Sequence, residues 1–108
     1  MIANLSAVQL RDRLADVAAT PTLLLDVRNA WEVELAPFKG ATHIPMNEIP
    51  ARLGELDPKT PIVAICHAGM RSMQVARFLD QQGFTELFNL AGGIDAWSVQ
   101  VDPSVARY

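Results

Sequence analysis

The apolar residues of the chain follow two different patterns. Short, nearly continuous apolar runs bounded by turn residues are typical of buried strands, whereas apolar residues three and four positions apart indicate helices. The predicted strands are residues 22–27, 41–44, 61–65 and 87–90, and the predicted helices are residues 6–17, 31–35, 47–56, 72–82 and 92–97. Strands separated by helices predict an α/β fold, in which helices cover both faces of a parallel sheet.

The ends of several predicted helices carry recognisable signals. Ser6 followed by Gln9 is a capping-box pattern, in which each side chain bonds the other residue's backbone N–H. Asn47 is a suitable N-cap, and Pro50 fits the first turn of the helix that follows it. The pair Gly92-Gly93 predicts a tight turn or a close backbone approach before the last helix.

Composition narrows the class of protein. The chain has 108 residues, of which 50% are hydrophobic, and a net charge of −3. This predicts one domain, residues 1–108, and argues against nucleic acid as a partner. Charges scattered through residues 1–17 argue against a signal peptide, and no apolar stretch is long enough to span a membrane. We therefore expect a cytoplasmic protein.

The chain has one cysteine and two histidines. A single cysteine excludes an internal disulfide, and no cluster of cysteines and histidines with metal-ligand spacing is present. It also excludes a second thiol that could resolve a disulfide within the chain. Any sulfur bound to this cysteine must therefore be passed to another molecule. We expect no metal and no cofactor.

Cys66 directly follows the predicted strand 61–65. The residues from there to the next helix are Cys66, His67, Ala68, Gly69, Met70 and Arg71. Open α/β sheets bind ligands at this edge, where a helix N-terminus and inward-turned loop N–H groups attract anions. Arg71 adds a permanent positive charge. Although a lone cysteine is often an inert core residue, this position favours a reactive thiolate.

Other polar residues lie at the same sheet edge. Asp26 and Arg28 lie at the C-terminal end of the predicted strand 22–27, and we expect them to brace the loop through ion pairs, with Glu32 or Glu34 as candidate partners. A direct catalytic role for Asp26 and Arg28 is the alternative. His43, between a strand and a proline, is expected to be structural.

Roles are also predicted for three further loop residues, two of which have two interpretations each, and for the two tryptophans. His67 either helps to hold Cys66 ionised or points outward. Met70 is expected to shape the wall or mouth of the loop. Ser72 either caps the following helix or forms a hydroxyl hydrogen bond with the sulfur. Trp31 and Trp97 are expected to be packing residues rather than substrate platforms.

The sequence resembles a single rhodanese domain, and the resemblance covers about residues 6–97. The motifs that carry it are LLLDVRNAWEVE (23–34), KGATHIP (39–45), CHAGMRS (66–72) and LAGGIDAW (90–97). The resemblance implies a five-stranded parallel sheet flanked by helices on both faces. It also implies transfer of a sulfane sulfur through a persulfide on Cys66, held in the loop 66–72.

One segment departs from the family pattern. Residues Ala36, Pro37 and Phe38 stand where family members commonly have Gly-His-Ile, which affects the expected rim of the pocket. The loop itself favours sulfur over phosphate, because only four residues separate Cys66 from Arg71. Cysteine phosphatases, including those of rhodanese-like fold, have a longer loop that can meet the several oxygens of a phosphoryl group.

These observations predict a sulfurtransferase. Cys66 would take sulfur from a small anionic donor such as thiosulfate and pass it to cyanide, a thiol or a protein acceptor. Two alternatives remain at this point: a relay that takes persulfide sulfur from a protein donor, and a non-catalytic regulatory domain of the same fold.

Overall fold

A computed structural model describes residues 1–16, 18 and 20–108 of the chain. Five strands form one parallel sheet in the order β1-β5-β4-β2-β3. The strands are β1 (Ile2–Leu5), β2 (Leu23–Asp26), β3 (Thr42–His43), β4 (Ile62–Ile65) and β5 (Leu87–Leu90). The helices are α1 (Ala7–Ala15), α2 (Ala30–Leu35), α3 (Met70–Gln81) and α4 (Gly93–Gln100), with the 3₁₀ turns η1 (Met46–Glu48) and η2 (Leu53–Glu55).

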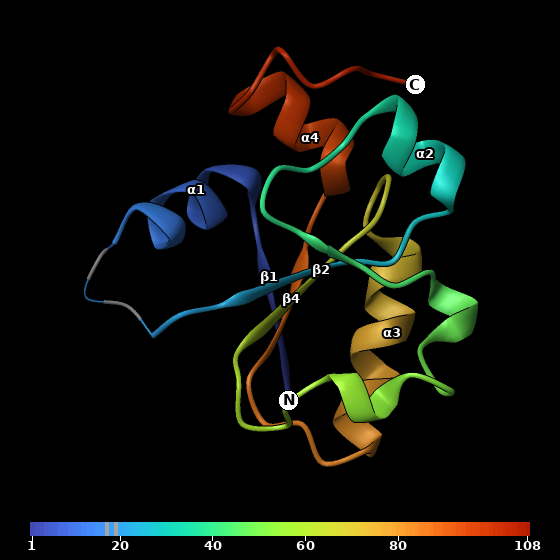
Figure 1. Cartoon of the computed structure of the whole chain (residues 1–108). Coiled ribbons are helices and arrows are strands. Elements are labelled where there is room, and N and C mark those ends of the chain that lie inside the picture. Colours follow the sequence, from blue (N-terminus) through green and yellow to red (C-terminus); the bar gives the residue numbers. More distant parts are fainter. Residues whose placement is uncertain (17, 19) are drawn as a thin grey trace.

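Both faces of the sheet are covered, as the alternation of strands and helices predicts (Figure 1). In β4, Ile62 packs into the core beside α3, whereas Val63 and Ile65 pack into the core beside α1 and α4. This division follows from the two-residue period of a strand. Cys66 has the same parity as Ile62, and it therefore belongs to the core on the α3 side.

Several predicted elements are confirmed near the expected residues. The capping box of α1 forms, since Gln9 N–H donates to Ser6 Oγ at 3.1 Å and Ser6 N–H donates to Gln9 Oε1 at 2.9 Å. The helix ends at Ala15, and Val17, which the prediction also placed in it, lies outside the described residues. No helix within the described residues is long and apolar enough to cross a membrane.

Two predictions of secondary structure are wrong. The sequence analysis missed β1, whose short segment Ile2–Leu5 has two exposed residues and pairs with β5 at the sheet edge. The predicted helix 47–56 is instead the two 3₁₀ turns η1 and η2. The first turn begins at Met46 rather than after Asn47, so Pro50 falls beyond the first turn, where a continuous helix would need the N–H that proline lacks.

Parallel pairing brings the site residues to one edge of the sheet. Asp26, at the end of β2, is in register with Ile65, at the end of β4. The strand pairing continues one residue further, where Val27 N–H donates to Ile65 O at 2.9 Å. The segment after β2 and the segment after β4 therefore leave the sheet side by side.

Candidate active site

The loop from Cys66 to Arg71, called the Cys66 loop, begins at the end of β4. The Cys66 side chain is only 1% exposed. Its Sγ accepts a hydrogen bond from Gly69 N–H at 3.0 Å and lies 3.2 Å from Ser72 Oγ. The loop therefore turns back so that a backbone donor of the loop meets the sulfur.

Two glycines permit this path of the backbone. Gly69 has a φ of +103°, which a residue with a side chain rarely adopts. Gly93 lies so close to the loop that an added Cβ would be 2.3 Å from His67 O and 2.5 Å from Cys66 O. This close approach lets Ile94 N–H donate to Cys66 O at 2.9 Å and Asp95 N–H donate to His67 O at 3.1 Å. The predicted close backbone approach at Gly92-Gly93 is confirmed.

The helix after the loop begins two residues earlier than predicted. Gly69, in the left-handed region, is the N-cap residue of α3, so Met70 and Arg71 belong to the first turn. Ser72 is consequently not the cap. Its buried hydroxyl lies against the sulfur, as the second interpretation of this residue expected, and it donates to Asn89 Oδ1 at 2.5 Å.

Arg28 is fully buried and pairs with Asp26. Its Nη2 lies 2.7 Å from Asp26 Oδ2, and its Nε lies 3.0 Å from Asp26 Oδ1. Burial opposes the charge of Arg28, but the hydrogen bonds from this guanidinium to Asp26 and Tyr108 outweigh that effect and raise its pKa. Arg28 also donates to Ala36 O at 2.8 Å. The ion pairs expected with Glu32 or Glu34 do not form: Arg28 and Asp26 pair with each other, and this pair braces the segment after β2.

Glu32 is the partner of Arg71. The two side chains form a bidentate pair, with distances of 2.6 Å from Nη1 to Oε1 and 2.8 Å from Nη2 to Oε2. The hydrogen bonds from Arg71 are the main reason why the pKa of Glu32 falls from 4.5 to about 2. The carboxylate of Glu32, together with the charge of a Cys66 thiolate, raises the pKa of Arg71. Glu32 was expected to pair with Asp26 or Arg28 instead, and Glu34, the other residue expected there, is exposed.

Tyr108 joins these two ion pairs, although no local pattern in the sequence indicates this role. Arg28 Nη1 donates to the Tyr108 hydroxyl at 3.1 Å, and that hydroxyl donates to Glu32 Oε2 at 2.7 Å. Burial is the main cause that raises the pKa of Tyr108 to about 12. We call the linked side chains of Asp26, Arg28, Glu32, Arg71 and Tyr108 the ionic network.

A second set of contacts supports the other partners of the sulfur. Asn89 is buried in β5, where its Nδ2 donates to Gly69 O and to Asn4 Oδ1, both at 3.2 Å. With the bond from Ser72 to Asn89 Oδ1, these contacts form what we call the neutral chain: Cys66, Ser72, Asn89, Asn4 and the Gly69 carbonyl. The sequence analysis missed Asn89, although a polar residue inside the buried strand LFNL is a detectable signal.

The remaining candidates lie at the margins of the loop. The His67 ring packs edge-on against Tyr108, with 4.3 Å between the ring centroids, and its buried Nδ1 has no hydrogen-bond partner among the described residues. Ala68 is exposed, and Met70 is 78% exposed, as expected for a residue at the mouth of the loop. His43 is structural as expected, since its Nε2 lies 2.7 Å from Arg28 O.

The two tryptophans differ. Trp97 packs against Phe38 in the core, with 4.8 Å between ring centroids, and confirms the expectation. Trp31 is 59% exposed, so it packs at the surface rather than in the core. The helix α2 buries Glu32 instead, because that residue must reach Arg71. Trp31 contacts the edge of the Tyr108 ring, with centroids 5.8 Å apart.

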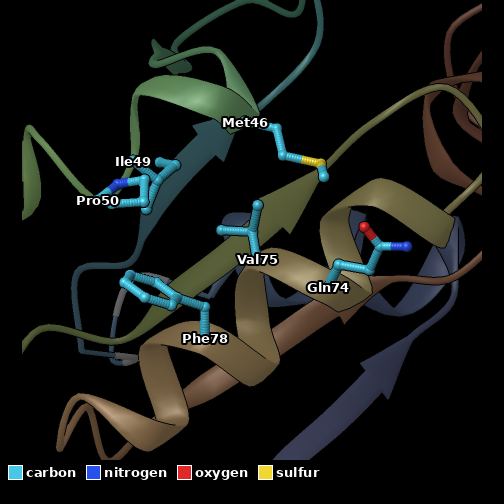
Figure 2. A pocket seen from close by; sticks show the side chains of 6 residues that line it. All are labelled: Met46, Ile49, Pro50, Gln74, Val75 and Phe78. Atoms are coloured by element: carbon cyan, nitrogen blue, oxygen red, sulfur yellow. The ribbon is translucent and has the colours of Figure 1, made fainter.

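Two hollows border the site. A pocket of about 230 Å³ is lined by Val27, Asn29, Met46, Asn47 and Arg71. An apolar pocket of about 180 Å³ shares Met46 with it and lies between η1 and α3 (Figure 2), lined by Met46, Ile49, Pro50, Gln74, Val75 and Phe78. The pocket beside Arg71 can admit a small anion. No group of three metal-ligating side chains occurs within the part of the chain that the structure describes.

The segment that departs from the family pattern lies away from both hollows. Ala36 and Phe38 are buried in the core on the α1 and α4 side, and Ala36 O accepts from Arg28. Pro37 and Phe38 line a different pocket, of about 490 Å³, beside Trp97. The departure therefore lines the pocket beside Trp97 rather than the two hollows beside α3.

The fold and the Cys66 loop define a rhodanese-like domain. The family model for the rhodanese-like domain matches residues 6–100, and the chain therefore belongs to the rhodanese family. A sulfurtransferase of Allochromatium vinosum is 36% identical over 98% of this chain and 97% of its own length. The crystal structure of SSP1007 from Staphylococcus saprophyticus has a TM-score of 0.81 and 32% identity, over 92% of this chain and 96% of that one.

A longer relative places the same domain in a larger protein. The chain is 34% identical, over 99% of its length, to the chloroplastic rhodanese-like/PpiC domain-containing protein 12 of Arabidopsis thaliana, and spans only 38% of that protein. Relatives named as sulfurtransferases support sulfur transfer as the general activity of this chain.

Proposed function

We propose that the protein is a sulfurtransferase in which Cys66 carries a persulfide. The observation that supports this most is the position of Sγ, which follows the central strand β4 and accepts the Gly69 N–H at 3.0 Å. A backbone donor fixed by the fold stabilises negative charge on sulfur without reorganising during the reaction. The charge of a Cys66 thiolate would contribute to the raised pKa of Arg71, so the two charges favour each other.

The transfer has two steps. The Cys66 thiolate attacks the outer sulfur of thiosulfate, a new S–S bond forms, and sulfite leaves with the electron pair of the broken bond. An acceptor such as cyanide or a thiolate then attacks the outer sulfur of the persulfide. The S–S bond breaks, and Cys66 is released as a thiolate. We invoke no general base, because the attacking species is an anion in each step.

A persulfide donor is a second candidate, favoured by the charge balance of the site. The ionic network contains two arginines and two carboxylates, and Glu32 holds both terminal nitrogens of Arg71. A doubly charged thiosulfate therefore meets no excess of positive charge. A singly charged organic persulfide needs less compensation, and the acceptor of its sulfur would again be Cys66.

Intact-mass measurement tests both candidates. The reduced protein and Cys66→Ala are incubated separately with thiosulfate and with glutathione persulfide, in the absence of reductant. We expect a gain of about 32 Da, one sulfur atom, that cyanide removes and that Cys66→Ala does not show. A gain with the persulfide alone would select the second candidate. No gain with either donor, or an equal gain in Cys66→Ala, would overturn the proposed function.

A further inference from the structure

The orientation of the Asn89 amide is fixed by its neighbours. Gly69 O is a backbone carbonyl and can only accept, so the nitrogen of Asn89 must face it, at 3.2 Å. Asn4 Oδ1 accepts from the same nitrogen. Asn89 Oδ1 is therefore the atom that faces Ser72, and it accepts the bond from Ser72 Oγ.

This orientation decides where the Ser72 hydroxyl hydrogen lies. A hydroxyl has one hydrogen to donate and two lone pairs. Because the hydrogen is directed at Asn89, Ser72 presents a lone pair to Cys66 Sγ at 3.2 Å. Such a contact suits a thiol, whose S–H can donate to Ser72. It opposes a thiolate, which needs a donor and receives one from Gly69.

We propose that Asn89 is a positioning residue that directs the Ser72 hydroxyl away from the sulfur and so opposes the loss of the Cys66 proton. When Cys66 loses its proton to solvent, the Ser72 hydroxyl must either keep a lone pair against the anion or rotate. Rotation would give the sulfur a donor but would leave the buried Asn89 oxygen without one. Both outcomes make ionisation require a higher pH.

The charged groups near Cys66 come from three other segments. Arg71 begins α3, Glu32 comes from α2, and the buried pair Asp26 and Arg28 follows β2. These four charges cancel in pairs. The titratable rings of His67 and Tyr108 lie against each other beside the loop. Substitutions at Ser72 and Asn89 leave all of these groups in place, so that their effects report on the neutral chain.

The first test is the pH dependence of alkylation of Cys66 by iodoacetamide, followed by intact mass. In Ser72→Ala, the thiol loses its acceptor and the thiolate loses the opposing lone pair. We expect the midpoint of the profile to move to lower pH by about half to one unit. Ser98→Ala is the matched control, because Ser98 is also buried and bonds Val105 O away from the sulfur. A midpoint that rises or stays in place in Ser72→Ala would overturn the proposal.

The second test uses Asn89→Leu, which frees the Ser72 hydroxyl to donate to the sulfur. We expect the midpoint to fall in Asn89→Leu but not to fall further when Asn89→Leu is added to Ser72→Ala. An equal fall in both backgrounds, or a rise from loosening of the Gly69 bond, would contradict the assigned role. The inference rests on Cys66 as the nucleophile of the proposed function. Alkylation needs no sulfur donor, so the failure of one proposal is distinguishable from the failure of the other.

Discussion

The two sets of contacts around the Cys66 loop differ in chemistry. The ionic network joins Arg71, at the start of α3, to Glu32 and through Tyr108 to the Asp26–Arg28 pair. It fixes segments that are far apart in the sequence by means of charge.

The neutral chain carries no formal charge. It runs from the sulfur through Ser72 to Asn89 and ends at Asn4 and the Gly69 carbonyl. The neutral chain acts by fixing the direction in which its hydrogen bonds are donated, whereas the ionic network acts through the attraction between charges. The comparison indicates that the two sets have different roles. The ionic network holds the segments around the loop in place, and the neutral chain sets the proton position at the sulfur. Four variants test that division.

The largest loss of stability is expected for Asp26→Asn. This change leaves the Arg28 guanidinium, which is fully buried, without its compensating charge. We expect the free energy of unfolding to fall by about 3 kcal/mol in urea titrations at pH 7. The exposed pair Arg11–Asp12 provides the control, since Asp12→Asn should change the free energy of unfolding by less than about 0.5 kcal/mol. Equal losses in both variants would remove the special role of the buried pair.

The second-largest effect is expected at low pH, where protonation of Glu32 weakens the ionic network and lowers the free energy of unfolding. The pKa of Glu32 in the folded protein, about 2, lies below its ordinary value of 4.5. Its contribution is therefore complete above about pH 4.5 and is lost as the pH falls towards 2. We expect the wild type to lose about 2 kcal/mol more than Glu32→Gln over that interval in urea titrations.

The control for this acid effect is Glu55→Gln, which removes a carboxylate from the exposed pair with Arg52. It should follow the wild type through the whole interval. If Glu32→Gln does so too, the Glu32–Arg71 pair does not stabilise the fold.

A smaller loss is expected for Tyr108→Phe. The ring still packs against His67, but the hydroxyl that bridges Arg28 and Glu32 is removed. We expect a loss of about 1 kcal/mol in thermal or urea unfolding at pH 7, with the midpoint of Cys66 alkylation unchanged. A clear shift of that midpoint would show that the ionic network also sets the proton position at the sulfur.

The smallest effect is expected for Asn4→Ala, at the exposed end of the neutral chain. Asn89 Nδ2 keeps its bond to Gly69 O, which is enough to preserve its orientation. We expect the free energy of unfolding to change by less than about 0.5 kcal/mol. A loss as large as that of Asp26→Asn would contradict the contrast between the two sets.

Local patterns predicted the frame of the site. The apolar run 61–65 and the helical spacing after it placed Cys66 at the sheet edge, and the register of β2 with β4 confirmed Asp26 and Arg28 beside it. These predictions succeeded because strand burial and helix periodicity are properties of adjacent residues.

The missed features depend on contacts between distant residues. Tyr108 is 76 positions from Glu32, and Asn89 is 17 positions from Ser72. No local spacing could pair them. The early start of α3 was missed for another reason, because Gly69 serves as its N-cap through its left-handed backbone rather than through a capping side chain.

The close approach of Gly93 has a consequence for how the loop can diversify. Because Gly93 lies against the loop, the backbone N–H groups of Ile94 and Asp95 reach Cys66 O and His67 O. Any residue except proline supplies such an N–H. Chains that keep a glycine at position 93 can inherit the loop's path while the exposed side chains at 68 and 70 are replaced freely. Selection can therefore change what the loop recognises without rebuilding the loop itself.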